Sequence, residues 1–457
     1  MAWDLDVLLG LAEARAEQAQ WPQALDAMRA VIALAPAHGE ALHLYGVLSC
    51  EEGALAVAVV AARRAVAVEP ANHDWLNILG ATLFDAGLPS QAVPLLCKAV
   101  AIAPYWESAL ANLANALTQC QRYNEASRLH ERNLTRQMGT RESIDAVVPC
   151  NSLRLRHDIE QIDHLISRGI APANAQEIID LYRHLLRETE KEGVGHRNFD
   201  VIPSRFGPAG AALGRLFHRA PPQRVPGRAV SLAWDRERTT EQFAAPPGIC
   251  WIDSFLTPEA LAALRRFCLE STIWQDISHN LQDQPTPRGY IGSYPSTGFS
   301  APLLYQIADE VSLALPAIFA GHSLRQMWSY KYEANLEGID LHGDDAAINV
   351  NFWITPDDAN LDRDGGGLMI YPVAAPDSWR FAEINRDQER IRRFVEGHRS
   401  VPVSIPYRQN RAVIFNSDLF HATARTRFKP GYENRRINVT MLFGRRRSSV
   451  VSSPAGL

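Results

Sequence analysis

His342-Gly343-Asp344 and, further along the chain, Phe415-Asn416-Ser417-Asp418-Leu419-Phe420-His421 are the stretches that decide the fold of the C-terminal half. On an extended segment the side chains of residues i and i+2 point to the same face, so His342 and Asp344 are presented together. His421 follows an apolar run over residues 411–415 that is typical of a buried strand. Two imidazoles and one carboxylate hold Fe(II) on one face and leave the opposite positions open. The pattern predicts a non-haem iron site.

The segment 436–443 alternates between polar and apolar residues, as a strand with two different faces does. Arg436, Asn438 and Thr440 share one face, and Ile437, Val439 and Met441 share the other. An arginine on the polar face is suited to grip a carboxylate with both ends of its guanidinium group. A solvent-facing edge strand is the alternative.

A second strand is predicted over residues 327–332, upstream of His342. Its last residue, Tyr332, has two interpretations: a phenol that contacts a bound small acid, or an ordinary core side chain. Residues 365–371 predict a glycine turn that feeds another strand, because glycine allows backbone conformations that other residues resist.

Residues 246–447 resemble the double-stranded β-helix, or jelly roll, of the Fe(II)/2-oxoglutarate-dependent oxygenases of the prolyl-hydroxylase-like kind. The markers follow the family's order along the chain: an opening strand and capped helix over 248–259, Tyr332, the His342-X-Asp344 motif, Gly365-Gly366-X-Leu368, His421 and Arg436.

The resemblance implies that His342, Asp344 and His421 are the catalytic metal ligands. It also implies that Arg436, with Tyr332, Asn438 and Thr440, binds 2-oxoglutarate. The implied cofactors are Fe(2+), 2-oxoglutarate and O2, with ascorbate as a reductant. Family members that halogenate lack the carboxylate, so the presence of Asp344 implies hydroxylation.

The interval between His421 and Arg436 is longer than the family's commonest spacing. Arg435 is therefore an alternative for the carboxylate-binding arginine, and Arg436 is preferred because it shares a face with Asn438 and Thr440. The stretch 275–300 is rich in proline, glycine and tyrosine and predicts a long loop. In the resembling enzymes this region often covers the substrate, so Arg288 and Tyr290 are candidate substrate contacts.

The N-terminal third carries an internal repeat. Ala35-Pro36, Glu69-Pro70 and Ala103-Pro104 recur every 34 residues, which is the period of tetratricopeptide repeats. Each proline is predicted to close a helix pair, and the pairs to form an α-helical solenoid over residues 1–139. The concave face of such a solenoid usually binds a peptide or a partner protein. Bracing of the catalytic domain and self-association into a homo-oligomer are the alternatives.

Three asparagines, Asn77, Asn112 and Asn115, are candidates for clamping a peptide backbone on this concave face, or else are ordinary surface residues. Residues 140–245 predict a helical extension followed by a linker rich in proline, glycine and arginine. The oxygenase-like domain follows over 246–447, and a tail occupies 448–457. The predicted fold is a helical solenoid joined to a jelly roll.

The overall composition narrows the class of partner. A net charge of −5 without a long like-charged block argues against nucleic acid as a partner. The chain contains no stretch of about 20 apolar residues, so no membrane span is predicted. The six cysteines have no paired spacing and are interpreted as buried thiols in a reducing compartment. These features predict a cytoplasmic enzyme.

Collagen prolyl hydroxylases and aspartyl/asparaginyl β-hydroxylases also join such repeats to an oxygenase domain, although the second group lacks the carboxylate ligand. By this analogy, the leading hypothesis is a hydroxylase of a peptide or protein side chain that the repeats dock. The alternatives are a biosynthetic hydroxylase of a small molecule whose repeats serve assembly, and a non-catalytic scaffold.

Overall fold

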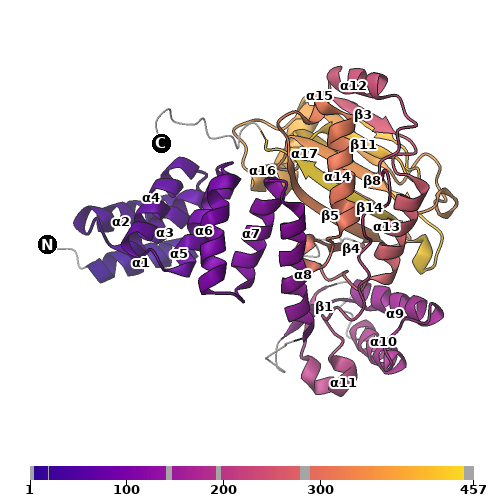
Figure 1. Ribbon diagram of the computed structural model, residues 1–457, viewed down its shortest axis with the longest axis horizontal. Helices are drawn as coiled ribbons and strands as arrows, with labels where there is room; N and C mark the ends of the chain where they lie inside the picture. The colour runs from indigo at the N-terminus through magenta and orange to yellow at the C-terminus, as the bar shows by residue number, and fades with distance from the viewer. Residues whose placement is uncertain (1–4, 19, 140–146, 192–196, 278–288, 447–457) are drawn as a thin grey trace. The chain divides into compact units, whose positions relative to one another are not determined.

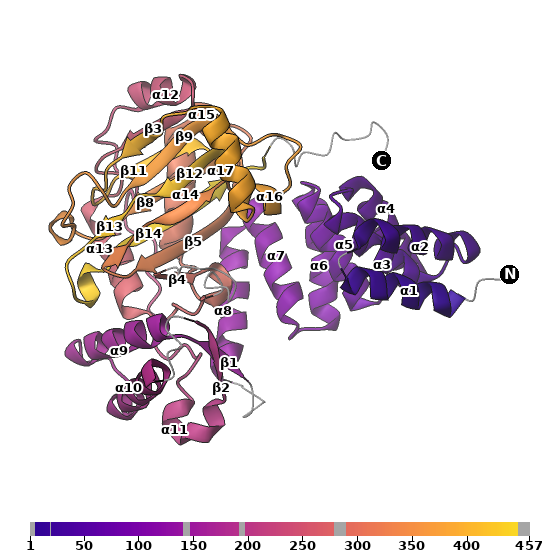
Figure 2. The same cartoon turned by 180° about the vertical axis from the view of Figure 1, so that it is seen from behind.

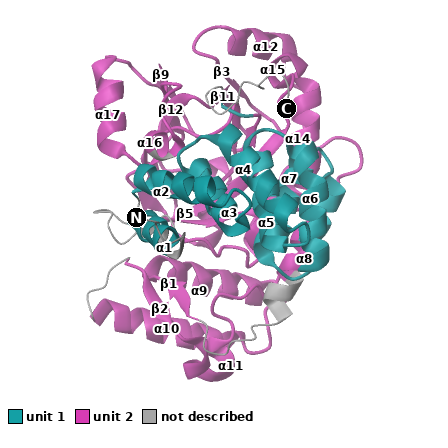
Figure 3. Ribbon diagram, turned by 90° about the vertical axis from the view of Figure 1, so that its left-hand side faces the viewer, with its two compact units in different colours: residues 1–129, 445–457 teal, residues 130–444 magenta. Residues whose placement is uncertain are grey.

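The computed structural model describes residues 5–18, 20–139, 147–191, 197–277 and 289–446. The chain divides into two compact units, which are drawn in different colours in Figure 3. Unit 1 contains Met1–Leu129 together with Arg445–Leu457, and unit 2 contains His130–Gly444. The residues 140–245 that the sequence suggests as an extension and linker lie within unit 2. Each unit is described by itself below.

Unit 1 is a row of antiparallel helix pairs that follow one another in chain order (Figure 1). The helices are α1 (Leu5–Glu17), α2 (Trp21–Leu34), α3 (Gly39–Glu51), α4 (Leu55–Val68), α5 (His73–Asp85), α6 (Pro89–Ile102) and α7 (Glu107–Gln119), followed by the start of α8 (Tyr123–Gly139). The repeated dipeptides lie where predicted, because Ala35, Glu69 and Ala103 are the C-caps of α2, α4 and α6. The predicted helical repeats are confirmed.

Small residues allow the two helices of a pair to approach closely. A Cβ atom on Gly80 of α5 would lie 2.5 Å from Cγ of Leu96 on α6, so the leucine occupies the space that a side chain would need. Gly46, one repeat earlier, faces the backbone of Ala58 and Ala62 on α4. The N-terminal ends of α3 and α5 are capped by the side chains of His38 and Asn72.

Unit 2 begins with helices and short strands that precede its main sheets. Their bounds are β1 (Val148–Cys150), α9 (Ser152–Ser167), α10 (Ala175–Lys191), β2 (Phe199–Val201), η1 (Pro203–Phe206), α11 (Gly207–Gly210) and α12 (Arg236–Ala244). The predicted helices over 152–192 are confirmed as α9 and α10. Strands β1 and β2 pair antiparallel and tie the two ends of this helical segment together.

The remainder of unit 2 is rich in strands and contains two larger sheets, in which every pairing is antiparallel. The six-stranded sheet has the order β3 (Ile249–Ile252), β11 (Ala412–Asn416), β8 (Ile348–Trp353), β14 (Ile437–Phe443), β5 (Leu324–Tyr332) and β4 (Tyr290–Ser293). The four-stranded sheet has the order β10 (Val403–Ile405), β9 (Leu368–Ala374), β12 (Leu419–Thr423) and β7 (Ile339–His342). Strands β6 (Asn335–Leu336) and β13 (Thr426–Arg427) form a separate small pair.

The two larger sheets share one apolar core. Leu368 and Ile370 of the four-stranded sheet belong to the same buried cluster as Trp353, Val413 and Phe415 of the six-stranded sheet. Helices α13 (Pro258–Glu270) and α14 (Pro302–Ala314) lie over the six-stranded sheet in Figure 1. In the reverse view, α16 (Phe381–Asn385) and α17 (Gln388–Gly397) lie on the side of the four-stranded sheet (Figure 2). The fold thus encloses a space between two antiparallel sheets.

Several sequence predictions are corrected by the structure. The proposed loop over 275–300 contains strand β4, which pairs with β5 so that Tyr290 lies opposite Tyr332. For residues 436–443 the structure excludes the alternative of a solvent-facing edge strand, because β14 lies between β8 and β5 and all of its residues are buried. All six cysteines were interpreted as buried, but only Cys150, Cys250 and Cys268 are; Cys50 and Cys120 are half-buried and Cys97 is exposed. Among the described helices, none has the length and apolar character needed to cross a membrane.

Candidate metal centre

The two histidines of the predicted triad are cross-strand neighbours. Strand β12 pairs antiparallel with β7, and their register places His421 directly opposite His342. Directly opposed residues in an antiparallel pair project to the same face of the sheet. The ring centroids of the two histidines are 4.4 Å apart. Residues that are distant in the sequence are therefore brought together by strand pairing.

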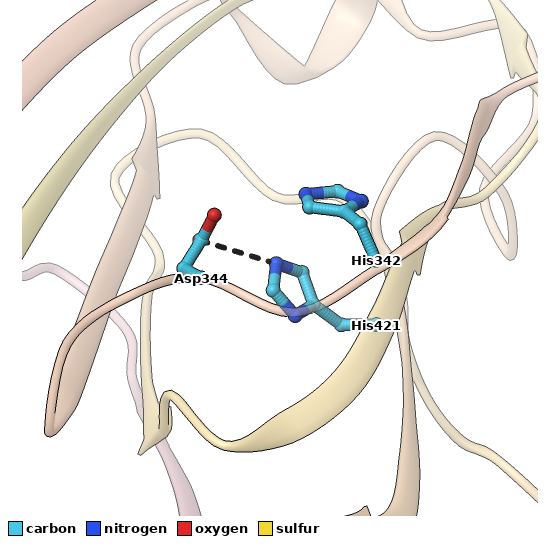
Figure 4. A group of neighbouring side chains, drawn as sticks. All are labelled: His342, Asp344 and His421. Atoms are coloured by element: carbon cyan, nitrogen blue, oxygen red, sulfur yellow. Dashed lines mark ion pairs between the residues drawn. The ribbon is translucent and has the colours of Figure 1, made fainter. Parts of the chain in front are cut away.

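Asp344 follows β7 and completes the group. Its Oδ2 atom is 3.4 Å from Nε2 of His421, and it accepts a hydrogen bond of 2.8 Å from Nδ2 of Asn349. The ligand atoms of His342, Asp344 and His421 all lie within 4.8 Å of one another (Figure 4). Burial opposes ionisation of Asp344, but His421, His342 and Asn349 outweigh it and lower the pKa of this carboxyl group. The ionised form of Asp344 is therefore favoured.

The hydrogen bonds of the two histidines fix which ring nitrogen carries the proton. Nδ1 of His342 lies 2.8 Å from the backbone oxygen of Asp340, and Nδ1 of His421 lies 3.0 Å from that of Leu419. A carbonyl oxygen only accepts, so each Nδ1 donates, and whenever a ring is neutral its lone pair lies on Nε2. Metal-binding histidines are commonly oriented by this kind of bond.

These three side chains fit a divalent iron ion. Their donor set is two imidazole nitrogens and one carboxylate oxygen, the combination that non-haem Fe(II) sites use. The histidine orientation and the ionised carboxyl group support the same conclusion. In the described part of the chain, no other group of His, Cys, Asp and Glu side chains converges in this way.

A cavity of about 90 Å³ opens beside the triad. A water molecule needs roughly 10–15 Å³ by this measure, so the space suits a small organic molecule. One wall is aromatic and is formed by Tyr290 of β4 with Trp328, Tyr330 and Tyr332 of β5. The rings of Tyr290 and Tyr330 are 4.8 Å apart, so β4 and β5 present them as one surface.

The side of the cavity formed by β8 and β14 is polar. Oγ1 of Thr440 accepts hydrogen bonds from Nδ2 of Asn351, at 2.9 Å, and from Nδ2 of Asn438, at 3.2 Å. The Oδ1 atoms of both asparagines are buried and have no partner among the described residues. Because a hydroxyl group both donates and accepts, either amide could be turned, yet one polar atom of each would still lack a partner. This side is arranged to meet a polar ligand.

The two neighbouring arginines point in different directions. Nε of Arg435 donates to Oε2 of Glu160 at 2.7 Å, whereas Nε of Arg436 donates to the backbone oxygen of Gly366 at 2.8 Å. The guanidinium group of Arg436 is buried over the ring of Tyr332, 4.4 Å from its centroid, and its Nη1 has no partner among the described residues. Arg436 thus stands behind Tyr332 rather than among the described residues that line the cavity.

The structure brings most of the predicted site residues to one cavity. Tyr332, Asn438 and Thr440 line it together with the triad, and so does Tyr290. Arg288 lies outside the described residues. Burial raises the pKa of Tyr332, although Arg436 and Thr423 partly oppose this effect, so the phenol stays protonated.

Sequence reasoning missed several residues of the site, namely Asn349, which donates to Asp344, and three residues that line the cavity. Asn349 and Asn351 interrupt the apolar strand β8 at alternate positions, and this period of two was a usable signal. Asn385 and Gln388 also line the cavity, from α16 and α17. Their helical segment carries no motif that connects it with the triad.

Unit 1 has a separate hollow of about 720 Å³ near the N-terminal ends of α3, α5 and α7. Its lining includes the rings of His43, Trp75 and Trp106 and the carboxyl groups of Glu40, Glu69 and Asp74. The predicted asparagine clamp differs from this arrangement: Nδ2 of Asn112 donates to Oδ1 of Asn77 at 3.0 Å, and Asn77 is buried. Asn115 is half-buried.

Comparison with known proteins identifies the repeats. Residues 109–142 match the family model described as tetratricopeptide repeat. No curated protein sequence matches the chain.

Solved structures match parts of the chain. A mutant O-GlcNAc transferase from Thermobaculum terrenum is 21% identical over 35% of this chain and 34% of that chain, with a TM-score of 0.28. A MamA structure designated AMB-1 is 20% identical over 30% of this chain and 76% of that chain, with a TM-score of 0.29. Another MamA structure is 15% identical over 42% of this chain and 96% of that chain, with a TM-score of 0.29. The chain thus spans about a third of the length of the transferase.

Proposed function

We propose that unit 2 is a non-haem iron oxygenase that uses 2-oxoglutarate and O2 to hydroxylate a C–H bond of a peptide or protein. The observation that carries the proposal is the convergence of His342, Asp344 and His421 at the edge of a cavity between two antiparallel sheets. This arrangement is the one expected for a double-stranded β-helix with a 2-His-1-carboxylate site.

In this proposal the triad residues hold Fe(II) through Nε2 of each histidine and the carboxylate of Asp344. Bound iron would allow O2 to oxidise 2-oxoglutarate to succinate and carbon dioxide and a substrate C–H bond to C–OH, with one oxygen atom of O2 entering each product. Asn349 keeps the carboxylate oriented by its bond to Oδ2. The backbone oxygens of Asp340 and Leu419 keep both imidazole rings in the required tautomer.

The co-substrate would lie between the triad and the polar side of the cavity. Asn438 and Thr440 offer polar atoms there, and Arg436 carries a positive charge directly behind Tyr332. A buried guanidinium group with an unpartnered Nη1 is the group best suited to attract the far carboxylate of 2-oxoglutarate. Tyr332 separates the cavity from Arg436. The carboxylate would therefore either bind the hydroxyl group of Tyr332 or contact Arg436 directly after Tyr332 changes its rotamer.

In this proposal the aromatic wall would shield the reacting side of the cavity from water. Tyr290, Trp328 and Tyr330 form an apolar surface beside the triad, and the hydroxyl groups of Tyr330 and Tyr294 bond to each other at 2.9 Å. Such a wall suits an aliphatic group held for hydrogen abstraction, because it packs on the substrate without competing for the iron.

Unit 1 would act as the docking arm. Tetratricopeptide repeats generally bind protein segments on one face of the solenoid. The hollow near α3, α5 and α7 combines tryptophan rings with three carboxyl groups and contains no lysine or arginine among its described lining residues. This chemistry favours a substrate segment with positively charged side chains, which are attracted by carboxylates and by aromatic faces.

The test is succinate formation by the purified full chain with Fe(II), 2-oxoglutarate, ascorbate and O2. We expect turnover that the His421→Ala variant loses and that His398→Ala, a change at an exposed histidine of unit 2, retains. Turnover that is absent in the wild type, or equal in both variants, would overturn the proposal and favour an interaction scaffold.

A further inference from the structure

Asn385 of α16 and Gln388 of α17 form a further part of the cavity wall, and they hold the segment that carries His342 and Asp344. Nδ2 of Asn385 donates to the backbone oxygen of Gly343 at 3.3 Å, and Nε2 of Gln388 donates to that of Leu341 at 3.0 Å. The backbone nitrogen of Gly343 in turn donates to the oxygen of Ile384 at 2.8 Å. Both carbonyl groups that flank His342 are therefore fixed by side-chain amides.

The amide of Gln388 can adopt only one orientation. Its Nε2 faces two backbone oxygens, that of Leu341 at 3.0 Å and that of Asn385 at 3.5 Å. Backbone oxygens accept but never donate, so turning the amide would set oxygen against oxygen. This distinguishes Gln388 from Asn351 and Asn438, whose partner is a hydroxyl group that both donates and accepts.

The other end of this amide lacks a partner. Oε1 of Gln388 is buried, and none of the described residues donates a hydrogen bond to it. Buried acceptors in folded proteins nearly always have a donor, because leaving one without a partner destabilises the fold. An unpartnered acceptor on a residue that lines the cavity is explained if the donor arrives with a ligand.

The charges around the cavity indicate what kind of donor fits. Its ionisable lining residues in the described part of the chain are Asp340, the triad residues and the tyrosines, without a lysine or arginine. An anionic group at this wall would meet carboxylates and the oxygen of Gln388. A neutral amide N–H has the complementary polarity and carries no charge to be desolvated.

We propose that Oε1 of Gln388 accepts a hydrogen bond from an amide N–H of the substrate, so that the oxidised group lies next to a peptide bond or carboxamide. This inference rests on the proposed oxygenase function and specifies its substrate class. Gln388 is then a substrate-binding residue that also positions the backbone on the N-terminal side of His342.

The probes are capped tripeptides of the form acetyl-Ala-Xaa-Ala-amide, with Xaa as each of the twenty residues, assayed as stimulation of succinate formation by the full chain. The tripeptide that stimulates most is then compared with analogues in which one amide N–H at a time is replaced by an ester oxygen. For the wild type we expect one replacement to lower kcat/KM about tenfold, the loss of one hydrogen bond. For Gln388→Met, which has similar length but no acceptor, we expect the amide and the ester to react alike.

Asn385→Ala is the matched control, because it removes the bond to Gly343 but leaves Oε1 of Gln388 in place. It should keep the tenfold preference for the amide, whatever its overall rate. A preference retained by Gln388→Met would assign Gln388 to positioning the backbone alone and would overturn the inference. Wild-type turnover of 2-oxoglutarate that no tripeptide stimulates would also contradict it. Absence of any wild-type turnover would instead show that the oxygenase proposal itself has failed, and this inference with it.

Discussion

Helices α1–α7 and unit 2 differ in the kind of polar side chain that they bury. Between residues 5 and 129, the polar side chains that the structure shows as buried are Ser49, Asn77, Thr82 and Thr118, none of which is charged. Unit 2 buries ionisable side chains, among them Arg154, Lys331, Asp344 and Arg436. Because a buried ionisable group is costly without partners, the described core of the repeats excludes such groups, whereas the core of unit 2 contains several. A buried ionisable group is therefore a candidate functional residue, and its hydrogen-bond partners show whether its role is structural or functional.

Two groups of buried polar atoms within unit 2 show how the hydrogen-bond partners distinguish a structural role from a binding role. Nζ of Lys331 donates to the backbone oxygen of Cys268 at 3.0 Å and to the hydroxyl group of Tyr432 at 2.7 Å, and it lies over the rings of Trp274 and Tyr432. The hydrogen bonds of Lys331 are thus made within the fold of unit 2. On the other face of β5, polar atoms of Asn438 and Gln388, which line the cavity, and of Arg436, which lies behind Tyr332, have no partner among the described residues. Partnerless polar atoms beside convergent ligand atoms distinguish a binding site from a structural network.

The largest expected effect concerns the two neighbouring arginines. Arg436→Ala should raise the KM for 2-oxoglutarate about tenfold to a hundredfold, because a charge-assisted bond to a carboxylate contributes about 1.5–3 kcal/mol. Arg435→Ala is the matched control: it removes the bond to Glu160 and should lower stability instead. KM values from succinate formation and unfolding in urea measure the two effects. An unchanged KM in Arg436→Ala, or a raised KM in Arg435→Ala alone, would reverse the assignment.

A smaller effect is expected in the repeats, where packing decides. Gly80→Ala should destabilise unit 1 by about 1–3 kcal/mol, because the new Cβ would collide with Leu96. Gly46→Ala, at the same position one repeat earlier, meets backbone atoms no closer than 3.4 Å and should change stability by less than about 1 kcal/mol. Hydrogen exchange of the α3–α6 amides in the full chain measures both. Equal effects of the two variants would show that the repeats are not packed as described.

The smallest effect is a pH dependence that belongs to Lys331. Burial lowers the pKa of this lysine well below its usual value of 10.5. Between the lowered pKa and 10.5, the unfolded chain holds a proton that the folded chain has released, so stability rises with pH across this window. The slope is at most about 1.4 kcal/mol per pH unit. The free energy of unfolding of Lys331→Met should therefore rise less steeply with pH than that of the wild type.

Urea unfolding at about pH 8 and about pH 10 measures this slope. Lys191→Met, a change at an exposed lysine, is the control and should keep the slope of the wild type. If Lys331→Met also kept it, the lysine would be unperturbed, and the network around it would not be the desolvated structural group described above.

The sequence predicted the repeats well because they depend on local spacing. The interval between Pro36, Pro70 and Pro104 records where helix pairs end, and that information is contained within each repeat. In unit 2 the sequence indicated β3, β5, β9, β11 and β14, whereas β8 and β10, among others, were not predicted and β4 lay in a segment expected to be a loop. Glycine, proline and tyrosine around Tyr290 indicated a loop there, and pairing with β5 overrode that local preference.

The site was predictable in part. The His-X-Asp spacing and the alternation that separates Arg436 from Arg435 are local, and the structure places the two arginine side chains on different partners. The pairing of His421 with His342 depends on strand register, which a single sequence does not give. The position of Gln388 depends on how α17 packs against β7, and nothing in its helix indicates the hydrogen bond to the backbone oxygen of Leu341.

The central claim is that three residues from separate parts of the chain form one iron site. Anaerobic equilibrium dialysis of the full chain against Fe(II) tests it most directly, with His342→Ala, His421→Ala and the exposed control His398→Ala beside the wild type. We predict about one iron per chain for the wild type and the control, as a single triad requires, and loss of that iron in both triad variants. Equal iron binding by the wild type and His421→Ala, or none by the wild type, would contradict the account.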